Sequence, residues 1–324
     1  MFSYGNKFKI TIYGASHENT MGLIIDNIKP GIKIDYNLIN NDLKARRPNN
    51  IGTTTRIEED EYIIKNGLFN NYTTGAPLHI EVLNKNIKSK DYSHLQYHFR
   101  PNHADFVASK KYHGFNDYRG GGFFSGRMTS LLVIAGSIAK MMLPFEFSSK
   151  ITQIGTCKDE KHFDNYLKEI IKQNDSVGGV VEVKATNLIV GLGDPYFNKV
   201  DAKIAEMMLT IPGVRGIMFG KNFNYESLGS QNNDLIINEK GKTKTNYSGG
   251  IVGGITNGND IVFNVYVKPT SSIQQEQLTY HFKNNKIEPL LIKGRHDVAF
   301  VRRIPVVLEN ALAIVLANFY LWKE

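Results

Sequence analysis

The run of glycines at Gly120–Gly122 constrains the fold of this 324-residue chain more than any other feature. Without Cβ atoms, these residues can adopt positive φ angles and let a ligand approach their backbone N–H groups. Apolar residues recur at helical spacing directly afterwards, at Leu131, Ile134, Ala135, Ile138 and Met142. Because Ser125 is a favourable N-cap, the sequence predicts a glycine turn followed by a helix over Gly126–Leu143.

Cationic side chains flank this turn. Arg100 and His103 precede the glycines, Arg119 adjoins them, and Arg127 follows them. The N-terminus of a helix attracts anions through its unpaired N–H groups and its dipole. Arginine adds charge-assisted, often bidentate hydrogen bonds to carboxylates and phosphates. The segment therefore indicates a site for a phosphorylated or carboxylated small molecule.

Composition narrows the possible partners. Contents of 41% hydrophobic and 22% charged residues are ordinary for a globular protein. The formal net charge of +8 is compatible with nucleic acid, a membrane surface or an anionic metabolite. Long runs of lysine and arginine are absent, and many arginines stand near glycine, proline or serine, which favours the metabolite. Binding of RNA stays open as an alternative that rests on charge alone.

The sequence also bears on the compartment. Cys157 is the single cysteine, which excludes an internal disulfide and fits a reducing environment. The N-terminal segment has no apolar run of signal-peptide length, and polar residues interrupt the apolar stretch Val306–Leu321. We therefore expect a cytoplasmic protein with no membrane partner. The apolar stretch is predicted to be a buried helix that begins at Pro305.

Hydrophobic patterns predict a mixed α/β fold. The expected strands are Lys7–Tyr13, Gly22–Ile28, Leu78–Leu83, Gly178–Ala185 and Asp260–Lys268. The expected helices are Tyr36–Ala45, Gly126–Leu143, Asp164–Gln173, Asn198–Leu209 and Val306–Leu321. The segments expected as surface loops, rich in asparagine and lysine, are Asn84–Lys90, Gln231–Asn246 and Gln274–Lys286. Because no break in composition divides the chain, we expect one domain over residues 1–324 with a single large core.

Four further segments place polar groups at turns. GASHEN follows the first strand and carries His17, and Arg46 closes a helix ahead of a proline. SGGIVGGITNG leads into a strand that ends at Lys268–Ser272, and KGRHD spans Lys293–Asp297. By itself His17 is weakly informative, and Arg46 is explained equally well by the helix dipole. None of these segments has the spacing of a phosphate-binding loop, a dinucleotide fingerprint, a nucleophile elbow or a metal site, so we expect no metal.

Taken together, these segments resemble the chorismate synthases over essentially the whole chain and in the family's order. The most specific matches are FRPNHAD, DYRGGG, KPTSSI and GRHD. The resemblance implies a lyase of the shikimate pathway, which leads to the aromatic amino acids. Its reaction is the anti-1,4-elimination of phosphate and a C6 hydrogen from 5-enolpyruvylshikimate 3-phosphate, giving chorismate. The family needs reduced FMN without net redox change, forms homotetramers and has a β-α-β sandwich fold with helices packed between sheets.

The resemblance also implies roles for individual residues. His17 matches the histidine that protonates the departing phosphate, His103 the histidine that holds the reduced flavin, and Asp297 the acid near flavin N5. The residues implied to bind substrate are Arg46, Arg100, Ser125, Arg127 and Arg295. The positions implied to bind flavin are Phe123, Phe124, Ser125, Gly253, Lys268, Pro269, Thr270, Ser271, Ser272 and Arg295. His296 stays undecided because it adjoins two matched positions.

The chain departs from the family pattern at several of these places. Phe123 and Phe124 stand where an arginine and a small residue are usual, and Pro212 and Gly213 replace a usual Asn-Ala pair. An arginine is also missing near Ile51, and Ala15 and Glu18 alter the first motif. The alternative is therefore a diverged, non-catalytic homologue that binds FMN or a phosphorylated metabolite. An active enzyme is favoured because both catalytic histidines and the late aspartate remain.

The source of electrons for the flavin is a separate question. Some members of the family reduce FMN with NADPH, whereas others rely on external reductants. This chain has no dinucleotide fingerprint and lacks the arginine near Ile51. We therefore expect an external flavin reductant.

Overall fold

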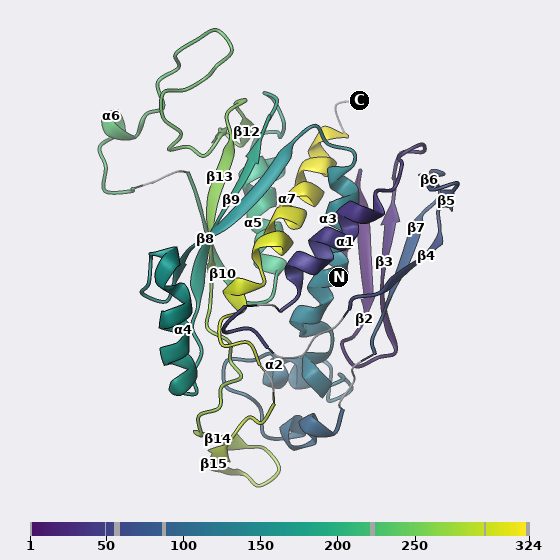
Figure 1. Ribbon diagram of the computed structural model, residues 1–324, viewed down its shortest axis with the longest axis vertical. Coiled ribbons are helices and arrows are strands. Elements are labelled where there is room, and N and C mark those ends of the chain that lie inside the picture. Colours follow the sequence, from purple (N-terminus) through teal and green to yellow (C-terminus); the bar gives the residue numbers. More distant parts are fainter. Residues whose placement is uncertain are drawn as a thin grey trace.

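Two antiparallel sheets enclose a layer of helices (Figure 1). The computed structural model describes residues 2–48, 50–54, 59–85, 89–220, 224–294 and 296–321. The first sheet has the order β1 (Ser3–Tyr4), β2 (Lys9–Gly14), β3 (Thr20–Asp26), β7 (Leu78–Leu83), β4 (Tyr62–Asn66). The second has the order β10 (Val214–Phe219), β13 (Ile261–Val267), β9 (Gly179–Thr186), β8 (Glu146–Ile154).

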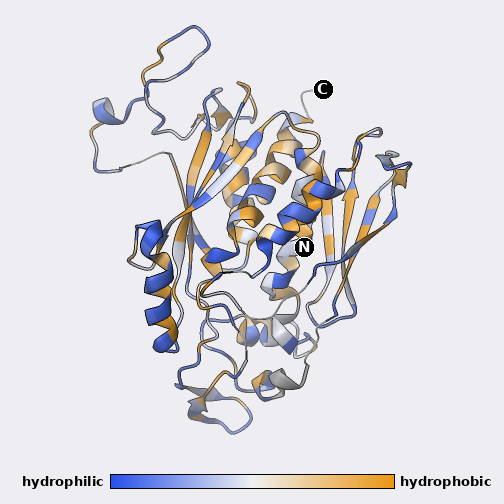
Figure 2. Ribbon diagram, viewed as in Figure 1, coloured by the Kyte–Doolittle hydropathy of each residue, from blue (hydrophilic) through white to orange (hydrophobic). Residues whose placement is uncertain are grey.

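The helices between the sheets form the centre of the core. They are α1 (Tyr36–Arg46), α3 (Thr129–Lys140), α5 (Val200–Thr210) and α7 (Pro305–Tyr320). Helix α7 is apolar on nearly all sides, as Figure 2 shows, and is buried along most of its length. A helix that is hydrophobic all round needs neighbours on every side, which the two sheets and the other helices provide.

Strand β7 shows how the sequence pattern sets the layers. Leu78, Ile80 and Val82 alternate with partly exposed residues and are fully buried. Because successive side chains of a strand point to opposite faces, this alternation turns one face of the first sheet toward the helices. The core is therefore a sandwich, as the resemblance implied.

Shorter elements extend beyond the sandwich. They are the 3-10 helix η1 (Ser89–Gln96), α2 (Asp105–Lys111), α4 (Phe163–Lys172), α6 (Gly229–Asn232) and the pairs β5 (Leu68–Phe69) with β6 (Tyr72–Thr73), β11 (Ile251–Val252) with β12 (Ile255–Thr256), and β14 (Gln277–His281) with β15 (Lys286–Leu290). Elements α2, β14 and β15 lie together at the lower end in Figure 1, whereas α6 lies on an arm at the opposite end.

All ten predicted elements are confirmed, nine with shifted ends and Leu78–Leu83 with the same ends. The helix expected over Gly126–Leu143 begins as a 3-10 turn at Gly126–Met128 and continues as α3. The Ser125 hydroxyl caps this turn by accepting a hydrogen bond from the N–H of Arg127. The predicted surface loops are wrong in part, because Gln274–Lys286 contains strand β14, Asn84–Lys90 includes the start of η1 and Gln231–Asn246 includes the end of α6. Residues 86–88 of the first loop lie outside the described residues. Strand β14 is polar at alternate positions and is defined by its pairing with β15.

Within the described residues, no helix is both long and apolar enough to cross a membrane. The expectation of one domain over residues 1–324 stays a prediction, which a single cooperative unfolding transition would support.

Candidate active site

A pocket with a volume of about 530 Å³ opens where the helical layer ends. Helices α1 and α5 end there, and α3 and α7 begin near it. The cations that line it are Arg46, Arg47, Arg100, Arg127, Arg215, Lys268 and Arg303. They outweigh the lining carboxylates Asp60 and Asp297, so the pocket suits anions.

The predicted glycine turn forms part of the wall. Gly120, Gly121 and Gly122 have φ angles of 58°, 87° and 56°, which glycine adopts without the steric cost of a Cβ atom. A Cβ on Gly120 would lie 2.0 Å from Cε1 of His17. A Cβ on Gly121 would lie 3.5 Å from Cε1 of His103. The two predicted catalytic histidines therefore both lie against the turn, His17 at Gly120 and His103 at Gly121.

His17 lies behind the wall of the pocket. It is 4% exposed, and its Nδ1 is 3.1 Å from the hydroxyl of Ser16. Its ring meets Tyr92 edge to face at 5.1 Å between centroids. Its neighbours Ser16, Tyr92 and Gly120 line the pocket, whereas the His17 side chain is covered by them.

His103 lies on the wall itself and is tied to Asp105. Its Nδ1 is 2.6 Å from Oδ1 of Asp105. The same carboxylate accepts hydrogen bonds from Nε of Arg100 at 2.7 Å and from its Nη2 at 2.8 Å. Arg100 also donates to Oγ of the buried Ser272 at 3.1 Å. One loop thus joins a predicted flavin histidine to a predicted substrate arginine.

Burial and charge set the protonation of this group. Burial lowers the pKa of His103, and the nearby Arg100 lowers it further, against the opposing hydrogen bond to Asp105. Burial would raise the pKa of Asp105, but hydrogen bonds from Arg100 and His103 outweigh it and hold that pKa well below its ordinary value. Asp105 is therefore ionised beside a histidine that favours its neutral form near pH 7.

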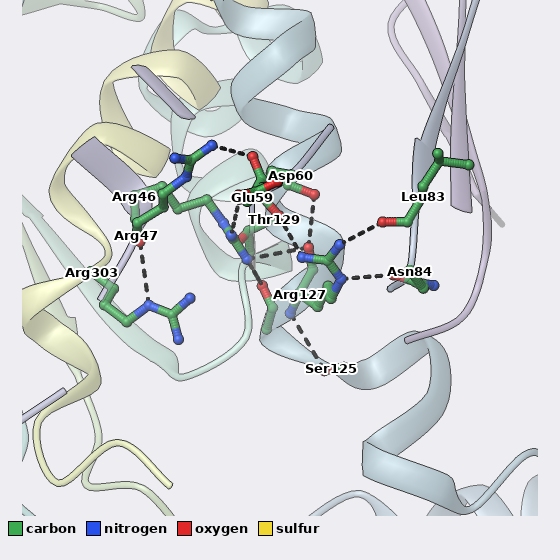
Figure 3. A network of polar contacts seen from close by, with 12 residues as sticks. Arg46, Arg47, Glu59, Asp60, Leu83, Asn84, Ser125, Arg127, Thr129 and Arg303 are labelled. Carbon is green, nitrogen blue, oxygen red and sulfur yellow. Dashed lines mark hydrogen bonds and ion pairs between the residues drawn. The ribbon is translucent and has the colours of Figure 1, made fainter. Parts of the chain in front are cut away.

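A second carboxylate, Asp60, binds two of the predicted substrate arginines (Figure 3). Its Oδ2 accepts from Nη1 of Arg46 at 3.0 Å, and its Oδ1 accepts from Nη1 of Arg127. The Asp60 side chain has no exposed surface. Arg46 also donates to Oγ1 of Thr129, and Arg127 to Oδ1 of Asn84. Both guanidinium groups are therefore fixed in place by the protein.

Asp297 lies between two donors. Its Oδ1 accepts from the N–H of Thr54 at 2.8 Å, and its Oδ2 accepts from Nη1 of Arg303 at 3.1 Å. His296, which the sequence left undecided, also lines the pocket. Burial, followed by the charge of Arg100, lowers the pKa of His296 to about 4. Its buried Nε2 has no hydrogen-bond partner among the described residues.

The segment Lys268–Ser272 closes another side of the pocket. Nζ of Lys268 and Oγ of Ser271 both donate to the carbonyl of Asn102, each at 2.7 Å. These bonds hold the loop of His103 against the end of strand β13. Oγ1 of Thr270 is buried and has no hydrogen-bond partner in the part of the chain that the structure describes. A buried hydroxyl without a partner is costly, so it fits a ligand that completes its hydrogen bonds.

Phe123 and Phe124 give the pocket an aromatic wall. Phe123 lies 4.7 Å from Phe124 between ring centroids, and it meets Phe2 and Tyr112 edge to face at 5.5 and 5.4 Å. Such arrangements suit aromatic rings. The residues that replace the usual arginine and small residue are therefore part of a packed cluster, and they offer apolar surface rather than charge.

The structure gathers most of the predicted site residues at this one pocket. The lining residues among them are Arg46, Arg100, His103, Phe123, Phe124, Ser125, Arg127, Lys268, Pro269, Thr270, Ser271, Ser272 and Asp297. Gly253 lies elsewhere, in the turn between β11 and β12, and is not among the residues that line this pocket. Arg295 lies outside the described residues.

Sequence reasoning missed Asp60, Asp105, Arg215 and Arg303. Asp105 ends the motif FRPNHAD, so its place beside His103 was a signal that could have been used. Asp60 lies within the acidic run Glu58–Glu61, which is typical of ordinary surface, and nothing local marks it as buried. Within the described residues, no group of three or more His, Cys, Asp or Glu side chains could hold a metal ion.

Comparisons with known proteins agree on one family. The family profile described as chorismate synthase matches residues 8–321. A chorismate synthase of Chitinophaga pinensis is 46% identical, over 100% of this chain and 98% of its own length. One of Pyrococcus abyssi is 38% identical, over 99% and 98%. A solved structure titled as chorismate synthase superposes with a TM-score of 0.76 over 99% of this chain and 93% of its own, at 24% identity, which supports the fold.

Proposed function

Because this chain belongs to the chorismate synthase family, we propose that the pocket between Gly120–Gly122 and Lys268–Ser272 is where it converts 5-enolpyruvylshikimate 3-phosphate into chorismate. The reaction removes phosphate and a C6 hydrogen by anti-1,4-elimination. The observation that carries the proposal is the convergence of His103, Asp297 and several arginines on one pocket. Identity of 46% to a named family member over full length does not favour the non-catalytic alternative.

The charge of the pocket fits this substrate. The molecule carries a phosphate and two carboxylates, which need cationic and hydroxyl donors in a site with little water. Arg46, Arg100 and Arg127 supply positive charge from positions fixed by Asp60 and Asp105. Since much of their donor capacity is used within the protein, we propose that they act largely through charge, with Ser125 donating beside them. Arg295, outside the described residues, is a further proposed contact.

The residues present also fit a bound FMN. The hydroxyl of Thr270 and Nε2 of His296 are buried groups for which the described residues provide no hydrogen-bond partner. Lys268–Ser272 would hold polar parts of the cofactor, and Phe123 and Phe124 would pack against apolar surface. When bound, reduced FMN supplies the electron-rich group that assists bond breaking without net redox change. Gly253 remains a proposed cofactor contact that would have to be made from outside this pocket.

Three residues manage protons in this proposal. His17, which Ser16, Tyr92 and Gly120 separate from the pocket in this structure, would supply the proton that the departing phosphate takes up. His103, which lies against Gly121, would hold the reduced flavin. Asp297, fixed by Thr54 and Arg303, helps to remove the C6 proton.

The test is an anaerobic assay with chemically reduced FMN and 5-enolpyruvylshikimate 3-phosphate. Phosphate and chorismate are expected to appear together, in equal amounts. Binding of both molecules without turnover would support a diverged, non-catalytic homologue instead. Steeply salt-dependent binding of random RNA would instead support the alternative of an RNA-binding protein, which rests on net charge alone.

We also propose the wider setting of the enzyme, with a cytoplasmic location, a homotetrameric assembly and an external flavin reductant. The last is supported by the missing arginine near Ile51. Oxidation of NADPH by the purified chain in the presence of FMN would contradict it.

A further inference from the structure

Asp105 makes an unusual set of contacts for a residue with no assigned role. It is the first residue of α2, and its side chain is 5% exposed. Its Oδ1 lies 2.6 Å from Nδ1 of His103, and its carboxylate accepts hydrogen bonds from Nε, Nη2 and the backbone N–H of Arg100 at 2.7, 2.8 and 3.2 Å. Oδ1 therefore lies within hydrogen-bond distance of both His103 and Arg100, whereas Oδ2 accepts from Arg100.

We propose that Asp105 is a positioning residue that fixes the proton of His103 on Nδ1 and leaves Nε2 to act at the pocket. An ionised carboxylate can accept hydrogen bonds but cannot donate them. The ring nitrogen 2.6 Å away must therefore be the donor. The other edge of the ring faces the glycine turn, since a Cβ on Gly121 would lie 3.5 Å from Cε1 and 3.7 Å from Nε2.

The choice of tautomer matters because the surroundings favour a neutral ring. The charged and titratable groups that act on His103 are Asp105, Arg100, Lys268 and His296. Burial and the neighbouring cations disfavour the imidazolium form, and a neutral imidazole can carry its proton on either nitrogen. The hydrogen bond made by one nitrogen decides which role the other can take. Asp105 makes Nε2 the acceptor unless a second proton is bound.

The loop around this pair is held from two sides, which limits other arrangements. Arg100 reaches Ser272, and Lys268 and Ser271 bind the carbonyl of Asn102. The carboxylate cannot turn away from His103 without giving up its two hydrogen bonds to the guanidinium group of Arg100. These three residues, which we call the Asp105 clamp, are His103, Asp105 and Arg100. The clamp couples the orientation of the His103 imidazole to the position of the Arg100 guanidinium group.

The first experiment needs neither cofactor nor substrate. Long-range ¹H–¹⁵N correlation of the histidine rings is recorded on the whole chain near pH 7, with His103→Gln to assign the signals. The proposal expects the proton of His103 on Nδ1. A proton on Nε2, with Nδ1 unprotonated, overturns it, and this holds whether or not any variant of Asp105 folds.

The second experiment exchanges one oxygen of the clamp. In Asp105→Asn, the remaining oxygen is expected to stay with Arg100 and the amide N–H₂ to face His103, which moves the ring proton to Nε2. Turnover is expected to fall by roughly tenfold to a hundredfold, as for other partners that orient a reacting histidine. The matched control is Ser272→Ala, which removes the other partner of Arg100 and should leave the ring nitrogens unchanged.

The role of His103 at the flavin rests on the proposed function, but the two ideas can fail separately. If the wild-type chain carries the His103 proton on Nδ1 but has no turnover, the proposed function is wrong and the proposal for Asp105 stands. An active Asp105→Asn variant with wild-type turnover and a moved proton removes Asp105 from the mechanism.

Discussion

Two of the carboxylates near the pocket, Asp60 and Asp105, hold cationic groups in place, and they do so differently. Asp60 binds two arginines, Arg46 and Arg127, and has no exposed side-chain surface. Asp105 binds one arginine, Arg100, and one histidine, His103. The first group consists of charges that do not change near neutral pH, whereas the second contains a ring that can gain, lose or move a proton.

This difference separates two tasks that an active site for polyanions must perform. Fixed arginine charges attract and orient anionic groups at any physiological pH. A histidine is useful only if its protonation state is controlled, which a neighbouring carboxylate does by hydrogen bonding. We therefore expect changes at Asp60 to act mainly on stability and binding, and changes at the histidines to act mainly on turnover.

The largest effect is expected for Asp60→Ala. The substitution leaves the guanidinium groups of Arg46 and Arg127 buried without the carboxylate between them. Breaking such a buried pair costs about 3–5 kcal/mol of unfolding free energy. Urea denaturation measures the loss. The control is Asp164→Ala, which removes the exposed partner of Arg302 and should cost about 1 kcal/mol or less. Equal losses in both variants would mean that the Asp60 clamp is no stronger than a surface ion pair.

Gly120→Ala tests the contact between the glycine turn and His17. The new Cβ would lie 2.0 Å from Cε1 of the imidazole, in a backbone with φ of 58°. We expect a loss of about 2–4 kcal/mol from strain and displacement, together with reduced turnover. Gly114→Ala is the control, because its φ of 79° carries similar strain while its Cβ would meet nothing within 4 Å. The Gly120 variant should lose more unfolding free energy than this control. Equal losses would show that the His17 imidazole can move aside at no cost in stability.

His17→Ala and His103→Ala are expected to lower turnover at least about tenfold while the protein stays folded. The reason is the loss of proton delivery at one site and of flavin orientation at the other. Steady-state kinetics with reduced FMN, supported by circular dichroism, measures both. Wild-type turnover in either variant removes that histidine from the mechanism, and unfolding of the His103 variant would assign it to the stabilising role that we expect for Asp60.

The same contrast explains what could be predicted from the sequence. The Ser125 cap, the glycine turn and α3 follow from neighbouring residues, so local patterns were enough. The burial of Asp60 depends on Arg46 and Arg127, which stand 14 and 67 residues away, and no local pattern marks it. Strand β14 was missed because pairing with β15, rather than its own composition, makes it a strand. The polar groups at turns directed attention to His103 and Asp297, and the resemblance to the family supplied their predicted roles.

The smallest effect concerns His296, whose charge the pocket suppresses. Its pKa falls from the ordinary 6.5 to about 4 through burial and the charge of Arg100, opposed by Asp297. Between these values the unfolded chain binds a proton that the folded chain does not, so stability is complete above pH 6.5 and declines as the pH falls toward 4. From pH 7 to 5.5 this amounts to about 1 kcal/mol. Urea denaturation of wild type and His296→Gln at both pH values measures it. The variant should lose less stability than wild type on acidification, and parallel losses would mean that His296 is already charged in the folded protein.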